Sequence, residues 1–196
     1  MTRETVLLGF SIIAAAAAVT FAVLWRQYRR RLHDHLGRDG RAPIRSIRLD
    51  EFDGAFAQDA LGPTTAAEVS FIGSGAGVPG GTSDREAWVL AVLAKTRRRF
   101  FEFGTATGRT TYLLARNSPP DARVTTITLA PDAHGDYTGA GGDDRHAARS
   151  ALAESAFTRF RYSGTDVEHK VEQFFGDSKQ LDTAPYRDSM DLIFID

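Results

Sequence analysis

Phe100-Phe101-Glu102-Phe103-Gly104-Thr105-Ala106-Thr107-Gly108-Arg109-Thr110-Thr111 is the stretch that decides the fold of this chain. The bulky, β-prone residues at its start predict a buried strand, its two glycines predict a tight turn, and the residues after them continue as a helix. Such a turn leaves free backbone N–H groups at a helix N-terminus, where a polar or anionic ligand can bind. In an open α/β sheet, ligands bind at the carboxyl ends of the strands, which is where this turn lies.

The spacing of the two glycines separates the known glycine-loop families. The dinucleotide fingerprint requires G-x-G-x-x-G, and the P-loop requires G-x-x-x-x-G-K-[ST]. Here the pattern is G-x-x-x-G, with an acidic residue near the strand end and hydroxyl residues in the turn. This resembles the first motif of class I S-adenosylmethionine (SAM)-dependent methyltransferases. The resemblance implies four cofactor-binding residues: Glu102, Gly104, Thr105 and Gly108. An ordinary strand–turn–helix of another α/β domain is the alternative.

Three further strands follow at distances that suit βαβ units: Arg123–Leu129, His169–Phe175 and Met190–Asp196. In the family that the chain resembles, an acid at the tip of the second strand commonly binds the ribose hydroxyls. The matching residue here is Thr128, which is a departure, because a hydroxyl cannot make the charge-assisted pair of bonds that an acid makes. Asp132 could substitute for that acid.

The third and fourth strands carry the remaining site predictions. After the third strand, Asp177 and Ser178 match a family motif that contacts the adenine amino group, and either residue could equally cap a helix. After the fourth, the resemblance implies that Asp196 borders the methyl donor and either holds a divalent metal or acts as the base. The cluster His134, Asp136, Asp143, Asp144 and His146 follows no ligand spacing rule, so no metal site is predicted.

These elements predict an α/β, Rossmann-like, doubly wound parallel sheet over residues 82–196. Sequential strands give the spatial order 3-2-1-4 and leave the fourth strand as an apolar edge. The family has seven strands, so the chain looks C-terminally truncated after the fourth. Such a product is expected to be inactive, unstable or completed by another chain, and its open edge could support a homo-oligomer.

Residues 1–25 predict a membrane anchor. Thr5 to Trp25 is a run of 21 residues without a charge, long enough to span a bilayer as a helix. Four arginines follow within six residues, so the positive-inside rule predicts a single-pass protein with a cytoplasmic C-terminal domain. A cleaved signal peptide would carry its basic residues before the apolar run instead. A buried core helix is the other alternative.

Residues 26–81 predict a basic juxtamembrane linker and a glycine-rich lead-in. Eight arginines between Arg26 and Arg48 could hold anionic lipid headgroups or only fix the topology. Asp50–Leu61 suggests a short helix that packs on the next domain, and Glu68–Ile72 suggests a strand that leads into a mobile glycine loop. Ser83 and Glu86 then form a capping box that opens a helix running to about Lys95.

Composition limits the function. The net charge of -1 does not favour nucleic acid, and the absence of cysteine excludes disulfides and thiolate chemistry. Taken with the resemblance, the prediction is a SAM-dependent methyltransferase that acts on an oxygen of a small-molecule acceptor. The alternative is a non-catalytic, membrane-tethered module for nucleotide binding or protein interaction.

Overall fold

The computed structural model describes residues 20–26, 28, 47–75, 81–132, 137 and 145–195. The chain divides into two compact units, Met1–Arg48 and Leu49–Asp196. In the first unit, residues 20–26 are helical. Within the described ranges, no helix has both the length and the apolar character needed to cross a membrane. Most of the predicted anchor, residues 1–19, lies outside the described residues.

The second unit opens with short elements: α2 (Leu49–Phe52), η1 (Gly54–Phe56), the antiparallel pair β1 (Gln58–Asp59) and β2 (Gly62–Pro63), and η2 (Thr65–Ala67). The helix expected over Asp50–Leu61 therefore ends early. Its end is explained by Asp53, whose carboxylate accepts an N–H two residues on and starts a 3-10 turn. The expected packing is made by Phe56, which is 1% exposed and meets Trp88 edge-on, whereas Phe52 is 56% exposed.

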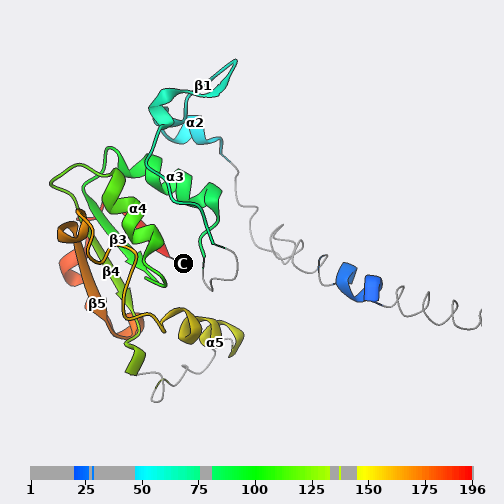
Figure 1. Cartoon of the computed structure of the whole chain (residues 1–196), viewed down its shortest axis with the longest axis vertical. Helices are drawn as coiled ribbons and strands as arrows, with labels where there is room; N and C mark the ends of the chain where they lie inside the picture. Colours follow the sequence, from blue (N-terminus) through cyan, green and yellow to red (C-terminus); the bar gives the residue numbers. More distant parts are fainter. Residues whose placement is uncertain are drawn as a thin grey trace, which may run out of the picture. The chain divides into compact units, whose positions relative to one another are not determined.

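The sheet domain follows in the order α3 (Asp84–Ala94), β3 (Arg99–Phe103), α4 (Arg109–Asn117), β4 (Arg123–Thr128), α5 (Arg145–Glu154), η4 (Glu168–Lys170), β5 (Val171–Phe175), η5 (Ser178–Gln180), η6 (Ala184–Tyr186) and β6 (Leu192–Ile195). The strands lie in the order β5-β4-β3-β6, and every neighbouring pair is parallel. Figure 1 shows β3, β4 and β5 side by side. This confirms the predicted α/β class and the spatial order 3-2-1-4.

The two helices that precede and follow β3 form as their sequences predict. Ser83 caps α3: its hydroxyl accepts the N–H of Glu86, and the Glu86 carboxylate accepts the N–H of Ser83. Helix α4 starts directly at the glycine turn, as predicted. The predicted strand over Glu68–Ile72 is wrong. This segment runs beside α4 instead, where the N–H of Ser70 donates to the Asn117 side chain at 2.7 Å.

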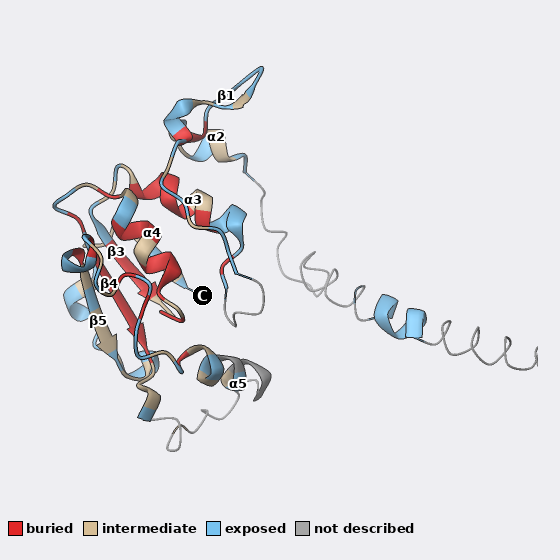
Figure 2. Ribbon diagram, viewed as in Figure 1, coloured by how far each residue is buried: buried red, intermediate tan, exposed pale blue. Residues whose placement is uncertain are grey.

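One face of the sheet carries the core. Phe100 and Val124 pack against Leu90 of α3 and Leu114 of α4, and all four are buried. Figure 2 shows this burial concentrated in α3, α4, β3 and β4. The predicted apolar edge is also confirmed, since β6 pairs with β3 alone among the described strands and leaves Ile193 58% and Ile195 74% exposed.

Candidate functional site

The glycine turn between β3 and α4 contains three residues with positive φ: Gly104 at +96°, Ala106 at +42° and Gly108 at +73°. The N–H of Gly104 donates to the Ile127 carbonyl of β4 at 3.0 Å, and the N–H of Gly108 donates to the Thr105 carbonyl at 2.6 Å. The turn is therefore held to the neighbouring strand and closed on itself. A left-handed alanine is uncommon, and strain of this kind concentrates at functional sites.

Gly108 is required by packing as well as by backbone conformation. A Cβ there would lie 2.7 Å from the Cβ of Phe160 and 3.0 Å from Cε1 of Tyr162. These two rings stack on each other, and the N–H of Arg161 between them donates to the Thr107 carbonyl at 2.9 Å. The segment 160–162 thus packs directly on the turn. Gly108 lines neither of the cavities described below, so its predicted contact with a cofactor stays a prediction.

A cavity of about 420 Å³, named here the main cavity, lies at the carboxyl ends of β3, β4 and β5. It brings together four of the predicted site residues from three separate motifs: Gly104, Thr128, Asp177 and Ser178. Apolar walls come from Phe103, Ile127, Leu129 and, at the end of β6, Ile195. The cavity therefore combines apolar surfaces with a few polar groups, as small-molecule sites do.

The local contacts of Asp177 match one of its two predicted roles. Its carboxylate accepts the N–H of Lys179 at 3.0 Å and so caps η5. The Lys179 ammonium lies 3.7 Å from the other carboxylate oxygen of Asp177 and 5.0 Å from the centre of the Tyr137 ring. This capping leaves the second prediction, contact with a ligand, compatible with the position of Asp177 in the cavity lining.

Thr128 is 8% exposed, and its carbonyl accepts the N–H of Gly176, which joins the ends of β4 and β5. The acid proposed from the sequence to assist it, Asp132, is not among the residues that line the main cavity. Glu154 of α5 does line the main cavity, although no motif of the sequence predicted it as a site residue. Local periodicity places Glu154 on a helix but does not tell which of its faces meets the sheet.

Glu102 is buried within the protein rather than directed at either cavity. It is 1% exposed, and its carboxylate accepts a hydrogen bond from the Thr111 hydroxyl of α4. This contact links β3 to the helix that follows the glycine turn. The predicted contact of Glu102 with the cofactor stays a prediction, whereas its hydrogen bond with Thr111 joins β3 to α4 on either side of the turn.

A chain of polar side chains, in which Tyr162, Thr105 and Thr126 are buried and Gln173 is half-buried, lies beneath the turn. The Tyr162 hydroxyl donates to Oε1 of Gln173 at 2.6 Å, and the Gln173 amide donates to the Thr105 hydroxyl at 3.2 Å. The Thr105 and Thr126 hydroxyls lie 2.8 Å apart. Burial, followed by the negative charges of nearby glutamates, raises the pKa of Tyr162, so its hydroxyl remains a donor. The network ties Thr105 to β4 and β5.

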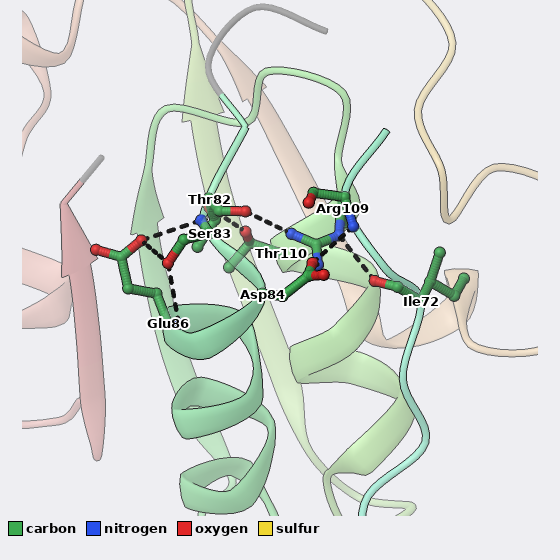
Figure 3. A network of polar contacts seen from close by, with 8 residues as sticks. Ile72, Thr82, Ser83, Asp84, Glu86, Arg109 and Thr110 are labelled. Atoms are coloured by element: carbon green, nitrogen blue, oxygen red, sulfur yellow. Dashed lines mark hydrogen bonds and ion pairs between the residues drawn. The ribbon is translucent and has the colours of Figure 1, made fainter. Parts of the chain in front are cut away.

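A smaller cavity of about 80 Å³, named here the second cavity, shares Gly104 and Ala106 with the main cavity. The predicted residue Thr105 lines it. Its other walls come from the rest of the turn and from distant segments: Gly73, Ser74, Gly75, Gly81, Thr82, Thr107, Arg109, Thr110 and Arg161. Figure 3 shows Arg109 between the segment that carries Ile72 and the start of α3. Arg109 is not among the site residues predicted from the sequence.

The last predicted site residue, Asp196, lies outside the described residues, as do His134, Asp136, Asp143 and Asp144. Within the described part of the chain, no group of three or more acidic or histidine side chains is arranged to hold a metal ion.

No protein-family model matches the chain, and no curated protein matches it. Among solved structures, it is similar to the O-methyltransferase TomG from Streptomyces achromogenes, involved in tomaymycin synthesis and solved in complex with SAM. The two share 29% identity over 59% of this chain and 45% of TomG, with a TM-score of 0.37. Cofactor-bound Rv0187 from MTB is 28% identical over 66% of this chain and 47% of its own, with a TM-score of 0.35. The chain thus spans about half the length of these proteins.

Proposed function

We propose that this protein is a SAM-dependent methyltransferase of the EC 2.1.1 type, which transfers a methyl group to an oxygen of a small-molecule acceptor. One observation carries the proposal. Gly104, Thr128 and the Asp177–Ser178 pair were each predicted from a different motif of the sequence, and all of them line the main cavity. The choice of oxygen as acceptor rests on the sequence resemblance.

The lining of the main cavity fits SAM chemically. Ile127 and Leu129 offer apolar surfaces for a purine ring, and Asp177 offers a carboxylate that can accept from an exocyclic amino group. The Thr128 hydroxyl can bind one ribose hydroxyl, and Glu154 offers the carboxylate that Thr128 lacks. When bound, SAM supplies a methyl group activated by a sulfonium.

The contribution of this chain to the reaction is mainly to bind and orient the reactants, since proximity alone can supply a large part of a rate enhancement. Ile195 and Phe103 line the main cavity at the ends of β6 and β3, which places apolar side chains beside the turn. Asp196 follows Ile195 in the sequence, and we propose it as the base that takes the proton of the acceptor hydroxyl.

Calorimetric titration of the purified full chain with SAM tests this proposal. Asp177→Ala should weaken SAM binding by about tenfold, the equivalent of one hydrogen bond. Asp182→Ala is the matched control, because Asp182 accepts the N–H of Ala184 in the same kind of local turn but does not line the main cavity. The control should bind SAM as the wild type does.

Two results would count against the proposal: a wild-type chain that is folded by circular dichroism and does not bind SAM, or equal losses of affinity in both variants. Saturable binding without methyl transfer to any of a panel of phenolic and catecholic acceptors would favour the alternative of a non-catalytic module.

We also propose that the N-terminal segment anchors the protein in a membrane. The support is the uncharged run from Thr5 to Trp25 and the arginines that follow it. Alkaline carbonate extraction of membranes from expressing cells tests this. An anchored chain stays in the pellet, and a chain released into the supernatant contradicts the proposal.

A further inference from the structure

Arg109 holds two distant segments against the start of α4. Its Nε donates to the Ile72 carbonyl at 2.9 Å, one terminal nitrogen donates to the Thr82 carbonyl at 2.7 Å, and the other donates to Asp84 Oδ1 at 2.8 Å. The guanidinium carbon also lies 5.5 Å from the centre of the Phe71 ring. Figure 3 shows these polar contacts. The Arg109 side chain is 10% exposed, whereas that of Asp84 is 55% exposed.

A second set of bonds surrounds the same residues. The N–H of Ser74 donates to Oδ1 of Asp84 at 2.6 Å, the oxygen that also accepts from Arg109. The Thr82 and Thr110 hydroxyls lie 2.8 Å apart. The Ser74 amide, followed by the charge of Arg109 and its hydrogen bond, holds the pKa of the Asp84 carboxyl below its usual range, so it remains an acceptor at neutral pH.

The held segments form walls of the second cavity. Gly73, Ser74 and Gly75 line it from one held segment, and Gly81 and Thr82 line it from the other. None of these five residues lines the main cavity. A ligand that extends from the main cavity past Gly104 would meet these walls, while a ligand confined to the main cavity would not.

We propose that Arg109 is a positioning residue which, by holding residues 71–75 and 81–84 on the glycine turn, sets the affinity for the part of the ligand that enters the second cavity. The proposal rests on the proposed function for the identity of that ligand. A guanidinium suits this role because its planar fork donates in three directions at once, whereas an ammonium is a single point of charge. Arg109→Lys should therefore fail to replace it.

The binding test compares two ligands of the full chain by calorimetry. S-adenosylhomocysteine carries an amino-acid tail, and 5′-methylthioadenosine has the same nucleoside without that tail. Arg109→Met and Arg109→Lys should each weaken S-adenosylhomocysteine binding by about tenfold and 5′-methylthioadenosine binding by less than about threefold. The matched control is Arg116→Met on the same helix, where the arginine pairs with Asp166 and lines neither cavity. It should leave the ratio of the two affinities unchanged.

A second measurement needs no ligand. Hydrogen–deuterium exchange should be faster over residues 70–75 in Arg109→Met than in the wild type or in Arg116→Met, because the segment loses its hydrogen bond from Arg109 to the Ile72 carbonyl. If Arg109→Met does not fold, Asp84→Asn takes its place, since Asp84 is 55% exposed and its loss weakens the same contacts.

The outcomes separate the inference from the proposed function. Three results would overturn the role of Arg109. They are an equal loss of affinity for both ligands in Arg109→Met, wild-type affinities in Arg109→Lys, and an unchanged rate of hydrogen–deuterium exchange over residues 70–75. A wild-type chain that binds neither ligand would refute the proposed function and with it the selectivity, and the exchange rates would still decide whether Arg109 holds the segment.

Discussion

Replacing Gly108 by alanine tests how the glycine turn is built. Gly108 has a φ of +73° and no room for a side chain, because a Cβ would lie 2.7 Å from Phe160 and 3.0 Å from Tyr162. Gly164 is a matched control in the same domain. Its φ is +76°, and an added Cβ there would meet nothing within 4 Å. The two substitutions share the backbone cost and differ in the packing cost.

The magnitudes follow from these two terms. A left-handed conformation costs an alanine roughly 1–2 kcal/mol at either position. Overpacking at Gly108 adds roughly 1–3 kcal/mol, because the rings of Phe160 and Tyr162 must move. Gly108→Ala should therefore lower the free energy of unfolding by about 2–5 kcal/mol and Gly164→Ala by about 1–2 kcal/mol. A domain of this size loses about 2–4 °C in Tm per kcal/mol.

Urea unfolding followed by far-UV circular dichroism measures both variants against the wild type. The informative quantity is the difference between the two losses, because any effect of alanine on the unfolded chain is common to both. A difference of about 1–3 kcal/mol supports the packing of Phe160 and Tyr162 on the turn. Equal losses would refute it, since they would mean that the segment 160–162 yields without cost.

Two further predictions concern buried polar groups. Burial raises the pKa of Tyr162 above its ordinary value of 10.0, so the folded state keeps a proton that the unfolded state releases. Stability should therefore fall as the pH rises above about 10, and Tyr162→Phe should reduce that slope in urea titrations between pH 8 and 11; an unchanged slope would contradict this. The Lys170 ammonium donates to the carbonyls of Ala115 and Ser118 at the end of α4. Lys170→Met should cost roughly 1–3 kcal/mol by urea unfolding, and a neutral effect would show that water replaces the ammonium.

Much of the fold could be predicted because it depends on local patterns. The capping box at Ser83 needs only Glu86 three residues away, and α4 needs only the glycine turn before it and the residues within it. The strand order followed because parallel strands joined by crossover connections have few arrangements. The same reasoning placed Thr128 and Asp177 at strand ends, where the structure brings them into one cavity.

The predictions that failed depended on competition between local and distant contacts. Residues 68–72 have the composition of a strand but bind α4 through Asn117 and Arg109 instead. The helix expected after Asp50 ends at Phe52, because the Asp53 carboxylate binds the backbone ahead of it. In both cases a side chain forms a hydrogen bond with backbone groups that were predicted to bond within a helix or a strand.

The sequence by itself determined the α/β class, the position of the glycine turn and the polar residues at the ends of the strands, since each depends on neighbours within a few residues. Only the tertiary structure decided what surrounds the turn. Arg109 meets Ile72 and Asp84, and Gly108 meets Phe160 and Tyr162, across separations of 25 to 54 residues. Such contacts leave no periodic trace in the sequence, because they depend on how the helices and loops pack around the sheet.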